Sequence, residues 1–217
     1  MHDTARIQVG EDILAVNRQL GRRNRARLEQ SGTRAINIMG AIGSGKTSLV
    51  EYSLGALKDK YSMAAIAGDV IADIDADRFK KFGIPVVPMN TGKECHLDAH
   101  LMEHALDILD LPTIDLLFIE NVGNLICPSD FYLGETCRVI VVSVTEGDDI
   151  VQKHPVIFKN GDLAIVNKVD ISEFVGADPD KMIRDALRNI KQAFKMSIRN
   201  GEGLDLWTSF IDEMMKK

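Results

Sequence analysis

The sequence predicts a doubly wound α/β domain, in which helices cover both faces of a mainly parallel sheet. From residue 34 onward, strongly apolar runs of strand length alternate with longer segments of helical pattern. Unbroken apolar strands are typical of parallel sheets that are buried on both faces. A glycine-rich loop between the first strand and the helix that follows it is the third observation behind this prediction.

One helical segment is expected before the sheet, because residues 11–30 place apolar residues among many Arg and Glu side chains. We therefore expect a helical extension over residues 1–33 and one globular domain over residues 34–217. Runs rich in Val, Ile, Leu and Ala predict strands at residues 35–39, 63–67, 86–87, 114–120, 138–144 and 163–166. Longer segments of mixed polarity predict helices at residues 47–58, 97–109, 178–193 and 203–216.

Composition narrows the possible functions. The chain has 217 residues, 45% hydrophobic and 27% charged, as expected for one globular domain. Its apolar runs are too short to span a membrane, and no basic segment with an apolar stretch marks a secretory signal, so a cytoplasmic protein is expected. A net charge of −6 argues against nucleic-acid or anionic-membrane partners. The three cysteines indicate metal binding or packing rather than a disulfide framework.

Residues 40–47, Gly-Ala-Ile-Gly-Ser-Gly-Lys-Thr, form a complete phosphate-binding loop. Its position between a strand and a helix favours this reading over a simple Gly/Ser-rich turn and predicts a P-loop NTPase fold. Lys46 is expected to reach the β- and γ-phosphates, and the Thr47 hydroxyl to bind Mg²⁺. The residues expected to contact the nucleotide here are Gly40, Gly43, Ser44, Gly45, Lys46, Thr47 and Ser48.

Carboxylates at the ends of other strands are candidates for the magnesium side of this site. Glu120 ends an apolar strand, Asp69 follows another, and Asp75 lies on the next segment. Such residues can hold the metal, and Asp69 is also expected to position the attacking water. Gly123 leaves its N–H able to approach a γ-phosphate. Solvated loop carboxylates are the alternative interpretation.

Residues 167–170, Asn-Lys-Val-Asp, directly follow a late strand and predict selection of guanine. The Asp170 carboxylate can accept hydrogen bonds from the guanine N1–H and exocyclic amine, whereas adenine has no matching donors. The Lys168 stem can lie along the base, and Asn167 belongs to the same motif. Ser197 lies in a later turn and is expected to approach the guanine carbonyl. GTP and GDP are therefore the expected nucleotides.

Cys95, His96 and Cys127 are candidate ligands for Ni²⁺ or Zn²⁺, since thiolates and imidazole suit both metals. Three such ligands leave a position open, and adjacent ligands favour a site shared across a two-fold interface. Ordinary buried or idle thiols are the alternative. Glu120 and Cys127 share one short segment, so release of the γ-phosphate is expected to alter the metal site.

His100 and His104 continue from His96 at i, i+4 spacing and would share one face of a helix. A solvated face is the simpler interpretation of this spacing, and metal transfer is the alternative. Cys137, just before an apolar strand, is expected to be a core thiol.

Through these motifs the chain resembles the HypB family, the GTPases that assist nickel insertion into [NiFe]-hydrogenase. The resemblance covers nearly all of the chain and rests on residues 40–47, 68–70, 90–98, 120–128 and 167–170. It implies a slow GTPase that forms a homodimer with GTP bound and carries metal at Cys95, His96 and Cys127 near the dimer interface. It also implies two partners, a HypA-type metallochaperone and the hydrogenase large-subunit precursor.

Two departures from the family pattern stand out. Residues 1–34 contain only His2 and no Cys, where some relatives carry a nickel-binding motif, so nickel is expected at the internal site. Ala41 stands where dimeric relatives in the wider class place a lysine that reaches across the dimer. Lys153 is a candidate replacement.

Three other functions remain open from the sequence. The first is the nickel-delivery GTPase of urease maturation, which normally shows a Cys-Pro-His string where Cys95 and His96 are directly joined here. The second is a small-molecule kinase, against which residues 167–170 speak. The third is a non-catalytic metal store or sensor that keeps its nucleotide only for structure.

Overall fold

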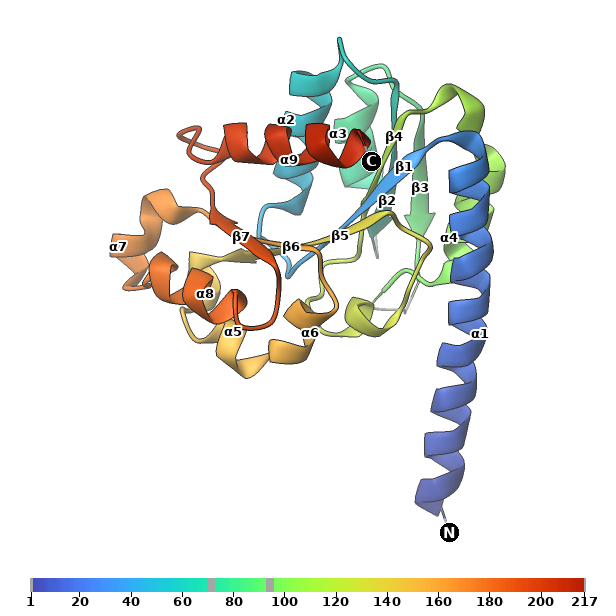
Figure 1. Cartoon of the computed structure of the whole chain (residues 1–217), viewed down its shortest axis with the longest axis horizontal. Coiled ribbons are helices and arrows are strands. Elements are labelled where there is room, and N and C mark those ends of the chain that lie inside the picture. Colours follow the sequence, from blue (N-terminus) through green and yellow to red (C-terminus); the bar gives the residue numbers. More distant parts are fainter. Residues whose placement is uncertain (1, 70–72, 93–95, 217) are drawn as a thin grey trace.

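The computed structural model of the chain describes residues 2–69, 73–92 and 96–216, and seven strands of this part form one sheet (Figure 1). The strands are β1 (Arg34–Met39), β2 (Met63–Asp69), β3 (Val86–Asn90), β4 (Leu116–Glu120), β5 (Cys137–Ser143), β6 (Leu163–Asn167) and β7 (Gln192–Lys195). Their order is β3-β2-β4-β1-β5-β6-β7, and every neighbouring pair is parallel. The strand order reverses around β1, where ligands bind in open α/β sheets.

Helices cover both faces of this sheet. They are α1 (His2–Ser31), α2 (Lys46–Leu57), α3 (Asp73–Lys80), α4 (Ala99–Ile108), α5 (Ile150–Lys153), α6 (Pro155–Lys159), α7 (Ser172–Val175), α8 (Pro179–Ala186) and α9 (Leu204–Met215). Helices α2, α3 and α9 pack on one face, and α1, α4, α5, α6 and α8 pack on the other. The predicted doubly wound fold is therefore confirmed. No helix within the described ranges is both long and apolar enough to cross a bilayer.

Several element boundaries differ from the prediction. The helix expected over 178–193 ends at Ala186, and residues 192–195 form the edge strand β7 instead. The helix expected from residue 97 begins at Ala99, because the Asp98 side chain caps it by accepting a hydrogen bond from the Leu101 N–H at 2.7 Å. The strand at 86–87 extends through Asn90.

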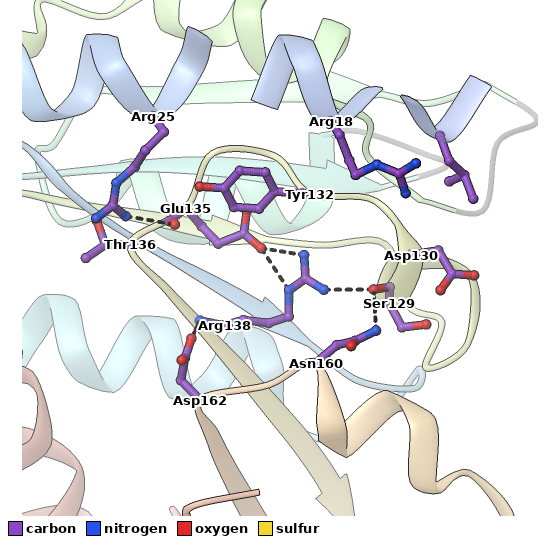
Figure 2. Close-up of a pocket in the computed structure, with 11 residues that line it drawn as sticks. Arg18, Arg25, Ser129, Asp130, Tyr132, Glu135, Thr136, Arg138, Asn160 and Asp162 are labelled. Carbon is purple, nitrogen blue, oxygen red and sulfur yellow. Dashed lines mark hydrogen bonds and ion pairs between the residues drawn. The ribbon is translucent and has the colours of Figure 1, made fainter. Parts of the chain in front are cut away.

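Helix α1 packs along one side of the domain, and its N-terminal part extends beyond the body of the domain (Figure 1). Its inner side is partly polar, since Asn24 is fully buried and donates to the carbonyls of Ala99 (2.8 Å) and Leu133 (3.0 Å). Arg25 adds a bond from Nη1 to the Glu135 carbonyl at 2.9 Å (Figure 2). These contacts tie α1 to the start of α4 and to the loop before β5.

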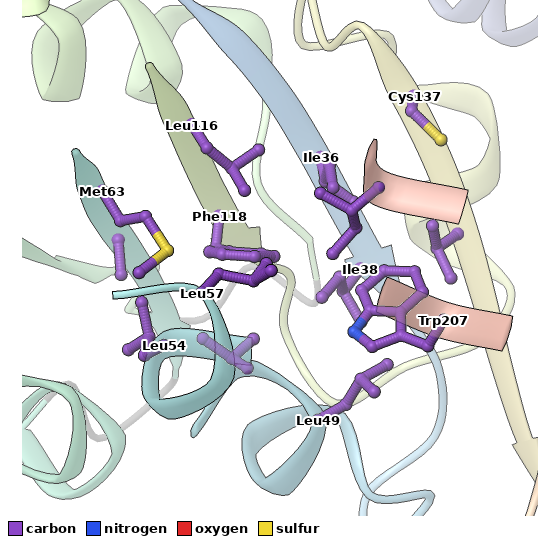
Figure 3. Packing of buried hydrophobic residues seen from close by; sticks show 14 of the residues in the cluster. Ile36, Ile38, Leu49, Leu54, Leu57, Met63, Leu116, Phe118, Cys137 and Trp207 are labelled. Atoms are coloured by element: carbon purple, nitrogen blue, oxygen red, sulfur yellow. The ribbon is translucent and has the colours of Figure 1, made fainter. Parts of the chain in front are cut away.

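The core between the sheet and α2 and α9 contains the only tryptophan of the chain. Trp207 is fully buried and lies with Ile38 and Leu49 (Figure 3). Its indole Nε1–H donates to the Ser53 Oγ at 2.8 Å, so α9 and α2 are joined by a polar bond within an apolar layer. Cys137 is buried in the same cluster, as predicted, and burial raises the pKa of its thiol far above the ordinary value.

Replacement of Ser53 by Ala is expected to lower the free energy of unfolding by about 1–3 kcal/mol, because the buried indole N–H of Trp207 then has no acceptor. Urea denaturation of the variant measures this loss. Ser53→Ala in a Trp207→Phe background is the control, since no indole is then left unsatisfied. An equal loss in both backgrounds would contradict the assigned role of the hydroxyl.

Candidate functional site

The phosphate-binding loop lies at the carboxyl end of β1 and leads directly into α2. Gly43 and Gly45 have φ values of 79° and 105°, a conformation that L side chains rarely adopt. A Cβ on Gly45 would also lie 2.2 Å from the Asn167 Nδ2. The loop therefore needs glycine at these positions, and it presents its backbone and the N-terminus of α2 to an anion.

Lys46 and Ser44 add polar groups at the same place. The Lys46 side chain is buried and its Nζ donates to the Ala41 carbonyl within the loop at 3.2 Å. The Ser44 Oγ is buried without a hydrogen-bond partner among the described residues. Ser48, one turn into α2, lines the neighbouring cavity. A positive charge, a helix N-terminus and an unsatisfied hydroxyl suit a phosphate ligand.

Thr47 and Glu120 meet beside this loop. The Thr47 Oγ1 donates to the Glu120 Oε1 at 2.7 Å, although the two residues are 73 positions apart. The other carboxylate oxygen of Glu120, Oε2, is buried and has no hydrogen-bond partner within the described chain. Hydroxyl and carboxylate oxygens are ligands that Mg²⁺ prefers. The pair therefore fits the magnesium ion expected with the nucleotide.

Burial of Glu120 has an electrostatic consequence. Desolvation raises the pKa of its carboxyl to about 7, although Lys46 and the Thr47 hydrogen bond oppose the shift. The pKa is raised further by the neighbouring carboxylate of Asp75. A cation bound between these oxygens would favour the ionised form, so proton release and metal binding are linked at this position.

Because the folded pKa of Glu120 lies above its ordinary value of 4.5, its contribution to stability is full below pH 4.5 and is lost as the pH rises through about 7. In the absence of Mg²⁺ and nucleotide, wild type is expected to lose up to about 3 kcal/mol across this window relative to Glu120→Gln. Urea denaturation at several pH values measures the difference. Glu173→Gln, at an exposed glutamate, should leave the profile unchanged. Parallel wild-type and Glu120→Gln profiles would contradict the burial argument.

The guanine motif lines a cavity of about 380 Å³ next to the loop. The Asn167 Nδ2 donates to the Ser44 carbonyl at 2.8 Å, which links β6 to the phosphate-binding loop. The Asp170 Oδ1 accepts from the Ser197 Oγ at 2.6 Å. Ser197 is fully buried, so its hydroxyl orients the carboxylate of Asp170 in addition to any contact with a ligand. Lys168 has a positive φ of 62° and lines the same cavity.

The remaining nucleotide-side candidates lie around Glu120. Asp75 is half-buried and forms an ion pair with the Arg78 Nη1 at 3.5 Å. Arg78 also binds Glu51 through two hydrogen bonds, which joins α3 to α2. Asp69 ends β2, next to β4 in the sheet, and its side chain lies outside the described residues.

Gly123 lies directly against the phosphate-binding loop. A Cβ at this position would meet the Ile42 Cγ1 at 2.4 Å, and Gly40 pairs with Asn124 in an isolated antiparallel bridge. The segment after Glu120 therefore contacts the loop along its backbone. A movement of the loop would therefore be transmitted directly to this segment.

The candidate metal ligands are only partly described. The His96 ring stacks on the Phe131 ring, with centroids 3.8 Å apart and an interplanar angle of 28°. Cys127 begins the 3₁₀ helix η2 (Cys127–Asp130) and its thiol is free and half-buried. Cys95 lies outside the described residues. Among the residues that the structure describes, no three His, Cys, Asp or Glu side chains form a ready metal cluster.

The other predicted residues have simple placements. His100 and His104 are both exposed on α4, with their Nε2 atoms 3.2 Å apart, so they share one face as expected. Lys153 is exposed on α5 and forms an ion pair with Asp149 at 2.6 Å.

Glu146 is a residue of this site that the sequence interpretation missed. The Ser143 side chain caps the 3₁₀ helix η3 (Val144–Glu146), and the Glu146 Oε1 accepts from the Ser143 N–H at 2.8 Å. Burial raises the pKa of Glu146, and the charges of Lys46 and Lys168 act against this shift. The capping sequence Ser-Val-Thr-Glu directly after an apolar strand is the signal that would have found it.

A larger cavity, of about 680 Å³, lies between α1 and the 129–138 segment (Figure 2). Its buried charges, Arg138 and Glu135, are paired with each other at 2.7 Å, and the backbone N–H of Arg138 donates to the exposed Asp162 at 2.8 Å. Among the described residues, three of the four buried side-chain atoms without a hydrogen-bond partner lie around the phosphate-binding loop, namely Ser44 Oγ, Glu120 Oε2 and Asn167 Oδ1.

Comparison with known proteins agrees with this geometry. The family model described as the CobW/HypB/UreG nucleotide-binding domain matches residues 34–197. A probable hydrogenase maturation factor HypB from Methanocaldococcus jannaschii is 52% identical over 219 residues, which cover 100% of this chain and 99% of that protein. The hydrogenase maturation factor HypB of Escherichia coli is 40% identical over 209 residues, which cover 95% of this chain and 72% of that protein.

Solved structures give the same result. The crystal structure of HypB from Archaeoglobus fulgidus matches with a TM-score of 0.87 at 48% identity, over 93% of this chain and 99% of that chain. HypB from Helicobacter pylori, crystallised in complex with nickel, matches with a TM-score of 0.85 at 34% identity, over 92% of this chain and 95% of that chain. The chain therefore belongs to the HypB hydrogenase maturation factors, within the CobW/HypB/UreG family of nucleotide-binding domains.

Proposed function

We propose that the chain is a Mg²⁺-dependent GTPase that carries nickel and delivers it during maturation of [NiFe]-hydrogenase, through GTP-dependent dimerisation. The observation that carries this proposal is the contact between the Thr47 hydroxyl and Glu120, beside an unsatisfied carboxylate oxygen. This contact supports a magnesium site at the start of the segment that ends in Cys127. The names of the HypB relatives, and the nickel in the Helicobacter pylori structure, support the nickel part.

In this mechanism the glycine loop and Lys46 hold the phosphates, and Asp170 with Lys168 and Asn167 holds the guanine base. Thr47, Glu120 and the carboxylates Asp69 and Asp75 are the proposed magnesium ligands, and the bound ion would neutralise charge on the phosphates. Asp69 is the proposed base that positions water, and Gly123 offers its N–H to the γ-phosphate. GDP and phosphate are the products.

Loss of the γ-phosphate would then release the segment 120–127, because Gly123 and Asn124 contact the phosphate-binding loop. Cys95, His96 and Cys127 are proposed to hold the transported Ni²⁺, and Zn²⁺ suits the same ligands. Movement of Cys127 relative to His96 would weaken the metal site and allow transfer. The energy source for transfer is the difference in metal affinity between the two nucleotide states.

The homodimer, the HypA-type metallochaperone and the hydrogenase large-subunit precursor are the proposed partners, in the cytoplasm. A dimer would complete a metal site whose adjacent ligands leave positions open. Lys153 is the proposed residue that crosses the interface toward the phosphates. Its present ion pair with Asp149 would have to open in that state.

A nickel-release experiment tests this function. The chain is loaded with Ni²⁺, GTP and Mg²⁺, and the transfer of nickel to a coloured indicator is followed together with phosphate release. The two signals are expected to rise together, and a non-hydrolysable GTP analogue should suppress both. Nickel release at the same rate with the analogue would show a metal store whose nucleotide is only structural.

A further inference from the structure

Asn121, which directly follows Glu120, connects the nucleotide side of the site to the backbone after His96. It is 1% exposed, and its N–H donates to the Ile38 carbonyl of β1 at 3.0 Å. Its side-chain Oδ1 accepts from the Leu97 N–H at 3.1 Å and from its neighbour's N–H, that of Val122, at 3.0 Å. One buried amide therefore fixes the residue next to His96 relative to the end of β4.

The same amide begins a longer buried network. The Asn121 Nδ2 donates to the Asn37 Oδ1 at 3.2 Å, and the Asn37 Nδ2 donates to the Glu135 Oε1 at 3.3 Å. Glu135 also accepts from the Arg138 Nε at 2.8 Å. All four side chains are less than 9% exposed. Because these side chains are shielded from water, loss of one hydrogen-bond partner costs more free energy here than it would at the surface.

At its other end, the network reaches His96 through Arg138 and Phe131. Arg138 donates from Nη1 to the Ser129 carbonyl at 2.8 Å (Figure 2). It also donates from Nη2 to the Phe131 carbonyl at 3.1 Å. The Phe131 ring is the one that stacks on His96. The first of these bonds also holds the short helix that begins with Cys127.

His96 is therefore held from two sides that start from different parts of the fold. The Arg138 side starts from β5 and the Asn37 side from β1, which are adjacent interior strands. Asn121 instead sits between Glu120, whose carboxylate contacts Thr47, and Gly123, which contacts the phosphate-binding loop. A shift of the 120–123 segment would move the Leu97 N–H, while Phe131 stays in place.

We propose that Asn121 is the positioning residue that couples the nucleotide state to the nickel ligands, by moving His96 against the fixed Phe131 ring. This inference rests on the proposed function, and it assigns the coupling to one hydrogen bond, from the Leu97 N–H to the Asn121 Oδ1. The Asn37–Glu135–Arg138 part of the network is the static support. Asn121 is neither one of the proposed nucleotide contacts nor one of the proposed metal ligands.

Three variants test this assignment. Asn121→Ala removes the acceptor of the Leu97 N–H, and Asn121→Asp keeps an acceptor oxygen there. Asn37→Ala is the matched control, because it removes an equally buried amide of the same network and leaves the bond to Leu97 in place. For each variant, the Ni²⁺ dissociation constant is measured by indicator competition with GDP and with a non-hydrolysable GTP analogue, and the melting temperature is recorded.

In Asn121→Ala the ratio of the two dissociation constants is expected to fall by about three- to tenfold, the size of one buried hydrogen bond. Asn37→Ala should lower the melting temperature about as much as Asn121→Ala does, but should keep the ratio of dissociation constants within about twofold of wild type. Asn121→Asp should retain more of this ratio than Asn121→Ala does. Equal ratios in wild type and Asn121→Ala would overturn the inference.

If the proposed function itself is wrong, the same measurements give a different result. If wild type itself binds Ni²⁺ equally in both nucleotide states, the proposed coupling is wrong and the role assigned to Asn121 in it falls as well. The Ni²⁺ affinities of the variants in the GDP state then show whether Asn121 positions His96 at all. Weaker Ni²⁺ binding in Asn121→Ala than in Asn37→Ala would keep that positioning role, and equal binding would remove it.

Discussion

Replacement of Lys46 by Ala is expected to lower kcat/KM for GTP hydrolysis by about 10²–10³-fold, the usual cost of removing one preorganised charged donor from a transition state. Lys46 is buried at the start of α2, and its Nζ lies within the phosphate-binding loop, 3.2 Å from the Ala41 carbonyl. Its charge can act on transferred phosphate with little screening by water. Phosphate release under saturating Mg²⁺ measures the effect.

Lys58→Ala is the control for this prediction, because Lys58 is an exposed lysine at the other end of α2. It should turn over GTP as wild type does. Wild-type turnover in Lys46→Ala would contradict the role assigned to Lys46. No turnover in either protein would show that the loop binds a nucleotide without hydrolysing it. That result would revive the metal store among the functions left open by the sequence.

Replacement of Asp170 by Asn is expected to weaken GTP binding by about 10²–10⁴-fold, since two hydrogen bonds to a charged acceptor are disturbed. The carboxylate is oriented by the buried Ser197 hydroxyl at 2.6 Å, so it presents its acceptors in a fixed direction. An amide at position 170 would donate where guanine also donates. Xanthine carries a carbonyl at that position, and xanthosine triphosphate should therefore bind the variant better than GTP does.

Competition binding with GTP, ATP and xanthosine triphosphate checks this change of specificity. Wild type should prefer GTP over ATP, because adenine leaves the Asp170 carboxylate without donors. Equal affinities of wild type for GTP and ATP would contradict the assignment of the cavity to guanine. They would favour the small-molecule kinase as the function.

Local patterns predicted the fold where strands are buried on both faces. All residues of β4 and β5 are buried, and each strand contains an unbroken apolar run, over residues 116–119 and 139–142. β7 escaped prediction because it is an edge strand of four residues, none of them fully buried. The eight residues of α3 are mostly polar and lack a clear apolar stripe.

The nucleotide-binding part of the site could also be predicted from local sequence patterns. Its residues lie in short contiguous motifs or directly at strand ends, where the fold class places functional groups. The bond from the Leu97 N–H to Asn121 could not be predicted, because a backbone donor leaves no trace in the residue type. The hydrogen bond from Ser197 to Asp170 could not be predicted either, because Ser197 lies in a turn 27 residues away.

We propose that one segment of backbone, residues 120–127, serves both the nucleotide and the metal. Equilibrium titration of the full chain with Ni²⁺, in GDP with Mg²⁺ and in a GTP analogue with Mg²⁺, tests it most directly when mass and bound metal are read together. We expect different nickel affinities in the two states and a dimer in the analogue state. Equal affinities with unchanged mass would contradict it.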